Sequence, residues 1–143
     1  MLVFKSFDPL RVYRLTLGRQ ARDAISNAVI IGRPRETFLL LWIETYRTFS
    51  QTDWSFYSTR VPNMLARLYP SLVHVDNRKL IRPSWTNRKL LFEVGYQLHW
   101  AEQFSCHVWT KAGRVPAAPE DLRNVNTTIG YMMKYIYIGK SNN

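Results

Sequence analysis

The sequence predicts an α/β protein with a short mixed sheet and flanking helices. Short apolar segments typical of strands alternate with stretches in which apolar residues recur every three or four positions. With 46% hydrophobic and 14% aromatic residues, the 143-residue chain is too apolar for a disordered tail. Its length fits one modest domain or part of a larger one, and it contains neither an internal repeat nor a low-complexity segment.

Four segments are expected to form strands, after a turn at Asp8–Pro9. The second is a continuous apolar run that ends at Gly32, which is typical of a buried strand. In the fourth, alternation places His107 and Trp109 on one face and Cys106 on the other. The four segments are residues 12–17, 28–31, 72–75 and 104–109.

Apolar spacing predicts three main helices. The first follows Pro34, and the second begins at Ser58 or Thr59 and ends before Pro70. The last begins at residue 127 or 128, where a threonine can cap it, and stops at Gly139. Short helices are expected over residues 87–94 and from 120. The expected buried faces are Phe38, Leu41, Trp42, Thr45, Tyr46 and Phe49; Val61, Met64, Leu65 and Leu68; and Ile129, Met132, Met133 and Ile136.

Twenty Lys and Arg against ten Asp and Glu give a formal charge of +10, which favours an anionic partner. The cations are scattered, without the blocks that are typical of nucleic-acid-binding tails. Cys106 is the single cysteine, which excludes an internal disulfide and a cysteine zinc cage. No apolar stretch is long enough to span a membrane, and the first residues do not form a signal peptide, so any targeting segment is expected upstream.

Polar and aromatic residues between the predicted elements are candidate ligand-binding groups. Ser26 and Asn27 precede the strand predicted over 28–31, where polar groups either line a cleft or make only turn hydrogen bonds. Trp54, Tyr57 and Trp85 lie in predicted loops or at element ends. Their rings could stack on sugars or bases, or serve only in packing.

His107 is the histidine with the most informative position, because Trp109 shares its face of a predicted strand. Its imidazole could bind a divalent metal, donate a hydrogen bond to a phosphate, or be a core group satisfied by the backbone. No zinc-helix spacing, glycine-rich phosphate loop or nucleophile elbow accompanies it. Asn126 opens an N-glycosylation pattern, which is usable only in a secretory compartment.

Seven segments follow one another over nearly the whole chain: FDPLRVYRLTLGRQ, ISNAVIIGRP, TFLLLWIETYR, WSFYSTRVPNMLARLYPSLVHV, LIRPSW, FSCHVWTK and NTTIGYMMKYIY. In this order they resemble the glycosyltransferases that carry a DXD sugar-binding region. That family includes α-1,4-N-acetylglucosaminyl- and α-1,4-galactosyltransferases and yeast mannosyltransferases. Each segment is short, and the specificity of the resemblance comes from their combination.

The resemblance implies a GT-A type fold, of which residues 1–143 would form one incomplete domain, the acceptor-side half. It implies retaining transfer of a hexose or N-acetylhexosamine from a nucleotide-sugar donor to a glycan acceptor in the Golgi lumen, with a divalent metal such as Mn²⁺. By the same resemblance, Ser26 and Asn27 lie near the reacting centre, Trp54 through Ser58 shape the acceptor side, and His107 lies near the metal and diphosphate. Trp85 completes the expected substrate-binding residues.

The DXD motif of the family is absent, because no two of the five aspartates are separated by one residue. The chain is therefore expected to be a C-terminal part that begins just past the motif. It should transfer no sugar by itself, because a departing diphosphate needs positive charge that a metal supplies. Two alternatives stay open: a basic nucleic-acid-binding module, and a non-catalytic sugar-binding protein that uses Trp54, Trp85 and Asn27. Nucleic acid is the less expected partner, and the sequence leaves the oligomeric state open.

Overall fold

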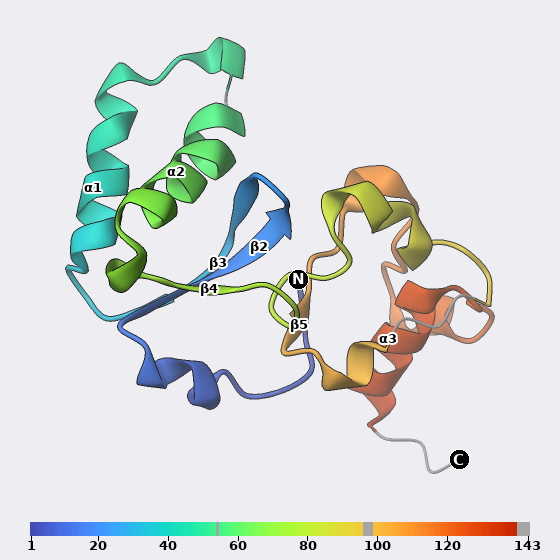
Figure 1. The fold of residues 1–143 in the computed structure, drawn as a ribbon. Coiled ribbons are helices and arrows are strands. Elements are labelled where there is room, and N and C mark those ends of the chain that lie inside the picture. The colour runs from blue at the N-terminus through green and yellow to red at the C-terminus, as the bar shows by residue number, and fades with distance from the viewer. Residues whose placement is uncertain (54, 96–98, 140–143) are drawn as a thin grey trace.

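A mixed three-stranded sheet lies at the centre of the molecule, in the strand order β3–β2–β4. β2 (Leu15–Ala21) and β3 (Ala24–Gly32) form an antiparallel hairpin, and β4 (His74–Asp76) runs parallel to β2 on its other side. Figure 1 shows the computed structural model, which describes residues 1–53, 55–95 and 99–139. The short mixed sheet with flanking helices confirms the predicted α/β class.

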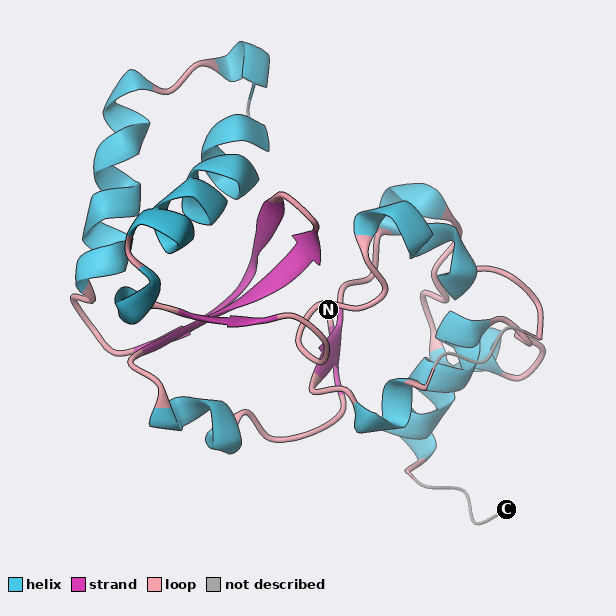
Figure 2. Cartoon of the chain, in the orientation of Figure 1, coloured by secondary structure: helices cyan, strands magenta, loops and turns pink. Residues whose placement is uncertain are grey.

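A second, two-stranded sheet joins the start of the chain to its C-terminal half. β1 (Leu2–Val3) pairs antiparallel with β5 (Ser105–Cys106), and Arg82 forms a parallel bridge with Cys106. Most of this half consists of short helical turns and loops around α3 (Thr128–Ile138), as Figure 2 shows. The C-terminal half therefore has little strand structure of its own.

Two helices lie beside the three-stranded sheet, away from the C-terminal half (Figure 1). α1 (Thr37–Thr45) follows the loop that contains Pro34, as predicted. α2 (Val61–Leu68) continues from a π-helical turn over Phe56–Arg60 and ends before Pro70. Among the described residues, no helix is both long and apolar enough to cross a membrane.

The ends of α3 are those that the sequence predicts. Thr127 caps the helix, because its Oγ1 accepts a hydrogen bond from the Gly130 N–H at 3.4 Å. Gly139 follows the helix with a φ of 86°, a backbone conformation that residues with a Cβ atom rarely adopt. Asn126, the acceptor of the glycosylation pattern, is exposed immediately before the cap.

One face of the hairpin packs on α1 and α2. Leu15 and Leu17 of β2 are buried together with Phe38 and Trp42 of α1. Residues i and i+2 of a strand share a face, which explains why these two leucines reach the same core. Trp42 also donates its indole Nε1–H to the Tyr57 carbonyl oxygen at 2.8 Å, so α1 is tied to the turn before α2.

The opposite face of the hairpin packs on the C-terminal half. Gly18 of β2 lies so close to the side chain of Ile81 that a Cβ atom at position 18 would overlap it. Val29 of β3 belongs to the same core. The other buried members of this second core are Leu10, Leu80, Leu91, Cys106, Trp109, Ile129 and Met132. The sheet is therefore covered on both faces, which explains why its strands are so apolar.

Several strand boundaries differ from the predicted ones. β2 starts at Leu15 rather than at residue 12, because residues 8–12 form a 3₁₀ turn, and it continues through Gly18. β3 extends beyond the predicted run of residues 28–31, so Ser26 and Asn27 lie inside the strand rather than before it. Gly18 lies within β2, where it allows close packing against Ile81, and does not form a turn. The turn between β2 and β3 contains neither Gly nor Pro. β4 and β5 cover only three and two residues, less than predicted.

Some predicted helix faces were also wrong. Tyr46 lies in a 3₁₀ turn after α1 and Phe49 directly follows that turn; they are 40% and 43% exposed instead of buried. Met64 and Leu68 of α2 and Ile136 of α3 are exposed too, against the prediction. Asn63 is buried in α2 instead. Helical spacing identifies residues that share a stripe, but the direction of the stripe depends on the neighbouring elements.

The short helical segments agree better with the sequence. The helix predicted over residues 87–94 is a 3₁₀ helix over Trp85–Leu91. Glu120 and Asp121 stand in the first turn of a 3₁₀ helix over Pro119–Leu122, where acidic residues were expected. The Asp121 carboxylate accepts hydrogen bonds from the N–H groups of residues 117 and 118, and these bonds lower its pKa.

Trp42→Ala should lower the free energy of unfolding by about 3–5 kcal/mol, because it removes a large buried side chain and its hydrogen bond to the Tyr57 carbonyl. Leu40→Ala on the same helix is the matched control, since Leu40 is 55% exposed and should change stability by less than about 0.5 kcal/mol. Urea unfolding measures both. Equal effects would show that the buried face of α1 is misplaced.

Gly18→Ala should lower the free energy of unfolding by about 1–3 kcal/mol, because the new methyl group would overlap Ile81. Ile81→Ala alone should lower it by about 2–5 kcal/mol through loss of buried volume. The double variant should be more stable than the sum predicts, because Ile81→Ala removes the atoms that the new methyl group meets. Strict additivity in urea unfolding would contradict the contact between the two layers.

Candidate functional site

A bulge in β3 presents two of the predicted site residues. Successive residues of β2 pair with Ile30 and with Ser26, so residues 27–29 have no partner in β2. The Ala28 N–H donates to Ser26 Oγ at 3.1 Å, which holds the bulge from within. Ser26 is buried and Asn27 is exposed. The bulge thus exposes the Asn27 amide, and bulges beside active sites commonly redirect a side chain in this way.

At the same edge of the sheet, Arg19 of β2 lies between two asparagines. Its Nε donates to Asn77 Oδ1 at 2.7 Å, and its Nη1 donates to Asn63 Oδ1 at 2.8 Å. Asn63 is buried in α2, and Asn77 directly follows β4. Because β2 and β4 are parallel, their carboxyl ends meet here, and α/β proteins commonly bind ligands at such an edge.

The electrostatics of this edge favour an anionic ligand. Burial lowers the pKa of the Arg19 guanidinium, and the positive charge of Arg67 on α2 lowers it further. Arg19 nevertheless keeps its charge, because guanidinium groups do not lose their protons in proteins. Two guanidinium groups with planar donors are suited to a diphosphate or another paired-oxygen anion.

Tyr57 and Ser58 lie in the π-helical turn before α2, and this turn contacts β3. Tyr57 donates its hydroxyl to the Thr48 carbonyl oxygen at 2.6 Å, and its ring lies 5.5 Å from that of Phe49 between centroids. Ser58 is buried. Trp54, the third residue expected on the acceptor side, lies outside the described residues. A substrate role for these residues stays a prediction.

Trp85 and His107 come together through Trp109. The ring of Trp109 stacks on His107 with 3.8 Å between centroids and meets Trp85 edge-on at 5.1 Å. The Arg88 guanidinium lies 3.8 Å from the centroid of the Trp85 ring. Trp85 is 45% exposed, but Arg88 covers one face of its ring, so a ligand would meet the rest of the ring together with the cation. Such a pair suits a sugar ring that carries an anionic substituent.

His107 is half-buried, and its Nδ1 atom is buried without a hydrogen-bond partner among the described residues. Burial lowers the pKa of the imidazole, and the positive charge of the Met1 amino group acts in the same direction. The predicted alternative of a core histidine satisfied by backbone groups therefore does not describe this atom. Because this nitrogen is buried, the structure offers a ligand no access to it.

The two groups of candidate residues are connected through the contact between the layers. Gly18 pairs with Ser26 in the hairpin and packs against Ile81. Arg82 then forms the bridge to the residue before His107. The bulge and the histidine are therefore linked by a short series of contacts, although they belong to different sheets. The structure brings Ser26 and Asn27 together on β3, and Trp85 and His107 together in the C-terminal half.

The residues around His107 do not by themselves fit a divalent metal. Among the described residues, no three His, Cys, Asp or Glu side chains lie close enough together to hold an ion. Mn²⁺ and Mg²⁺ prefer carboxylates and other oxygen ligands, whereas His107 would supply one nitrogen. The metal stays a prediction for a protein that also carries the DXD motif.

Arg19, Asn63 and Asn77 were not predicted from the sequence. Arg19 and Asn77 stand near the ends of two strands, a position that becomes informative only once the strands are known to be parallel. Asn63 had a visible signal, because it is a polar residue in the predicted first turn of an apolar helix.

The predicted strand face shared by His107 and Trp109 was wrong, because β5 ends at Cys106. Their rings stack all the same, in the segment that follows β5, and the contact of Trp109 with Trp85 depends on the fold.

The chain is similar to the "Glucan organizing enzyme 1" of Cryptococcus neoformans var. grubii. The two are 31% identical over 121 residues, which covers 75% of this chain and 33% of the relative. The chain therefore spans about a third of the length of the curated relative that it matches. No protein-family model matches the chain. No solved structure matches it significantly either.

Because the pKa of His107 is lowered in the folded protein, the unfolded chain binds more protons just below the ordinary histidine pKa of about 6.5. The free energy of unfolding should therefore fall as the pH decreases through this range toward the lowered pKa. His107→Gln should weaken this dependence, and His99→Gln, at an exposed histidine, is the matched control. Urea unfolding at several pH values between about 7 and 5 measures this pH dependence. An unchanged slope in His107→Gln would contradict the assignment.

Proposed function

We propose that this chain forms the acceptor-side part of a retaining, nucleotide-sugar-dependent glycosyltransferase domain of GT-A type. Its reaction would transfer a hexose or an N-acetylhexosamine to a glycan. The observation that carries the proposal is the bulge in β3, which exposes Asn27 two residues along the strand from Ile25, the residue that pairs with Arg19. A nucleotide sugar needs both groups in one place, an amide for sugar hydroxyls and a cation for the diphosphate.

The ordered segments and the relative both support a carbohydrate substrate. The name of the Cryptococcus protein associates it with glucan, and most of this chain aligns with it. Because the chain spans only a third of that protein, the activity of a whole enzyme, its donor and its acceptor are parts of the proposal. The aromatic group of Trp85 and Trp109 supports it independently, since it offers a ring on which a sugar can stack.

In the proposed reaction, the bond between the anomeric carbon and the diphosphate oxygen breaks, and the acceptor hydroxyl attacks from the same face. The departing diphosphate oxygen takes up the proton of that hydroxyl. Positive charge develops on the sugar and negative charge on the diphosphate. Arg19 and Arg67 would stabilise the negative charge, because their guanidinium groups lie close enough to influence one another. Asn27 would orient the sugar through its hydroxyls.

A metal and a cellular location enter the proposal only through the family resemblance. A divalent metal such as Mn²⁺ would supply positive charge to the departing diphosphate in an enzyme that also contains the DXD motif. The Golgi lumen is the location proposed for such an enzyme.

Asn27→Ala should weaken binding of a short gluco-oligosaccharide to the 143-residue chain roughly tenfold, through loss of a side-chain hydrogen bond. Asn124→Ala is the matched control, because Asn124 is an exposed asparagine in the C-terminal half. Isothermal titration calorimetry measures the affinity, and NMR shifts of the Asn27 side-chain amide locate the binding. The chain by itself should turn over no UDP- or GDP-sugar.

Three results would contradict this proposal. Absence of glycan binding, or binding that Asn27→Ala leaves unchanged, would contradict a glycan-binding site at the bulge. Turnover of a nucleotide sugar by the chain would contradict the proposal that sugar transfer requires the DXD motif. A salt-dependent gel shift with single-stranded RNA that Asn27→Ala weakens would favour the nucleic-acid-binding alternative.

A further inference from the structure

A groove lies at the other edge of the three-stranded sheet. One depression of about 250 Å³ is bordered by Tyr13, Arg14 and the segment 70–74. A wider one of about 780 Å³ is bordered by Arg11, Tyr13 and the segment 30–34. Tyr13 borders both depressions, which we together call the Tyr13 groove. The wider one alone is large enough for a ligand of more than one ring.

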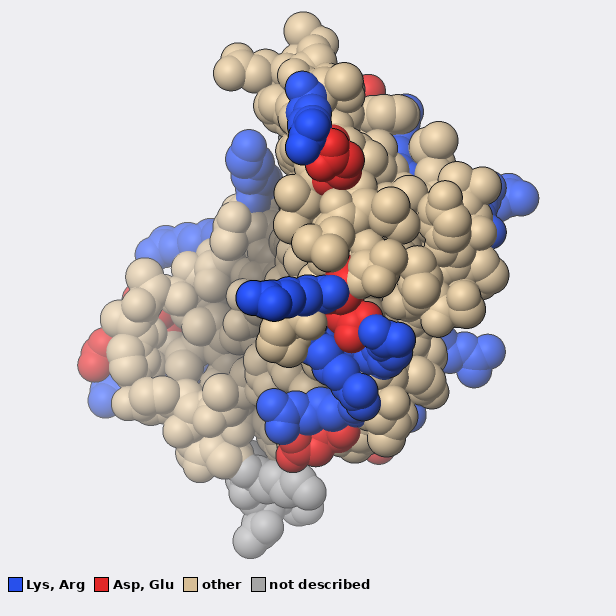
Figure 3. Space-filling view, turned by 90° about the vertical axis from the view of Figure 1, so that its left-hand side faces the viewer, with Lys and Arg blue, Asp and Glu red and all other residues tan. Residues whose placement is uncertain are grey.

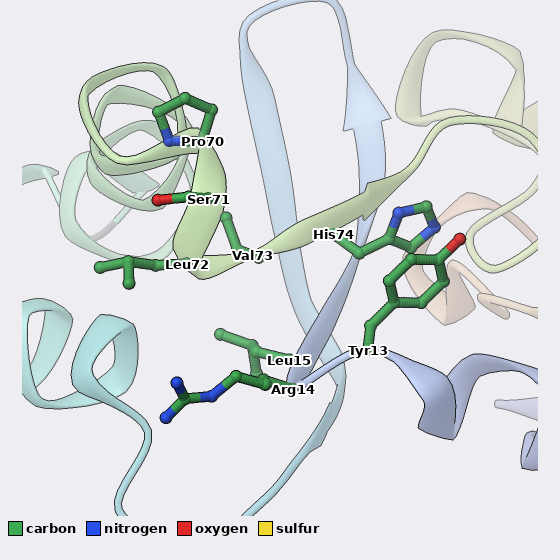
Figure 4. A pocket seen from close by; sticks show the side chains of 8 residues that line it. All are labelled: Tyr13, Arg14, Leu15, Pro70, Ser71, Leu72, Val73 and His74. Carbon is green, nitrogen blue, oxygen red and sulfur yellow. The ribbon is translucent and has the colours of Figure 1, made fainter.

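Tyr13 and His74 form a rigid aromatic pair in this groove. Their ring centroids lie 3.7 Å apart and the rings are 5° from parallel. Figure 4 shows the two rings face to face at one end of the smaller depression, while Arg14 extends toward the other end. Tyr13 is 43% exposed although His74 stacks on it, so the ring remains accessible. A ring that a neighbour already fixes can bind a sugar ring with little loss of side-chain entropy.

Arginines outnumber carboxylates around the groove. The Arg14 Nε atom lies 3.2 Å from the carboxylate oxygen Oε2 of the buried Glu36. This ion pair uses Nε and not the terminal nitrogens at the outer end of the guanidinium. Arg11 contacts Asp8 at 3.5 Å on the surface. Arg33 forms no ion pair with any residue that the structure describes. On the side of the molecule that Figure 3 shows, Lys and Arg side chains are more numerous than Asp and Glu, although acidic side chains lie beside several of them.

The Tyr13–His74 pair of the groove lies at the opposite end of the sheet from Arg19. It lies where β2 and β4 begin, at Leu15 and His74, whereas Arg19 lies toward the end of β2. The distance along β2 from Leu15 to Gly18, which pairs beside the bulge, is about 10 Å. The wider depression extends to Ile30, the residue after the bulge, but Asn27 borders neither depression. The groove and the candidate glycosyl-transfer site are therefore neighbours on β3 with different lining residues.

We propose that the Tyr13 groove binds a carboxylate-bearing oligosaccharide, with one sugar ring stacked on Tyr13. Arg33 and the outer end of Arg14 would bind carboxylates of different sugar units, because Arg14 extends away from Tyr13. An accessible aromatic ring flanked by guanidinium groups matches both parts of a uronic-acid unit. Single-stranded nucleic acid fits less well, because its usual binding sites have successive aromatic rings along a cationic groove. Here Tyr13 and His74 stack on one another and present a single platform.

Calorimetry of the 143-residue chain with a short oligogalacturonate tests this proposal. Binding should weaken with added salt, because it depends on charge. Tyr13→Ala and Arg33→Ala should each weaken it roughly tenfold, while Tyr13→Phe should retain most of the affinity because the ring remains. Tyr137→Ala is the matched control, since Tyr137 is an exposed tyrosine on α3. In the wild-type chain, NMR shifts should concentrate at Tyr13 and His74.

Unchanged affinity in both Tyr13→Ala and Arg33→Ala would overturn the proposal, as would absence of binding. Equal or tighter binding of a neutral gluco-oligosaccharide or of single-stranded RNA at Tyr13 would overturn the assigned ligand class. If Tyr13→Ala does not fold, the ligand-induced NMR shift changes of the wild-type chain test the site instead. Shift changes that occur away from Tyr13 and His74 would contradict the site. Because Asn27 borders neither depression of the groove, its variant tests the proposed transferase site separately.

Discussion

The close packing of Ile81 against Gly18 is the contact on which the arrangement of the molecule depends. β2 presents leucines to α1 and α2 on one face, and on the other face Gly18 provides the space that Ile81 fills. The chain then passes from Ile81 to the bridge between Arg82 and β5. A single position without a side chain thus lets the C-terminal half reach the sheet and brings His107 within a few contacts of the β3 bulge.

The same sheet provides two chemically different edges. At the carboxyl ends of β2 and β4, Arg19 is held by amide oxygens, and the bulge exposes Asn27. At the opposite edge, Tyr13 and His74 form an aromatic platform among arginines. Strand polarity separates them, because parallel strands end at one edge and begin at the other. Both proposed sites therefore depend on the parallel pairing of two strands that are far apart in the sequence.

The candidate site could be predicted from the sequence only where one short segment contains the information. Ser26 and Asn27 were singled out as polar residues beside an apolar run, although they lie within the strand and owe their geometry to a bulge. His107 and Trp109 were expected on one face of a strand; the strand ends before both, yet their rings stack in the segment that follows. The group of Arg19, Asn63 and Asn77 was not predicted, because three separate segments contribute to it.

The sequence by itself determined the alternation of strands and helices, the cap and end of α3, and the burial of Phe38 and Trp42. These features depend on periodicity and on end residues within a few positions of one another. Only the tertiary structure decided that Gly18 continues a strand, that Met64 and Leu68 face outward, and that Trp85 meets Trp109. Those outcomes depend on which distant surface packs against each segment, and a local pattern of apolar residues carries no information about the identity of that surface.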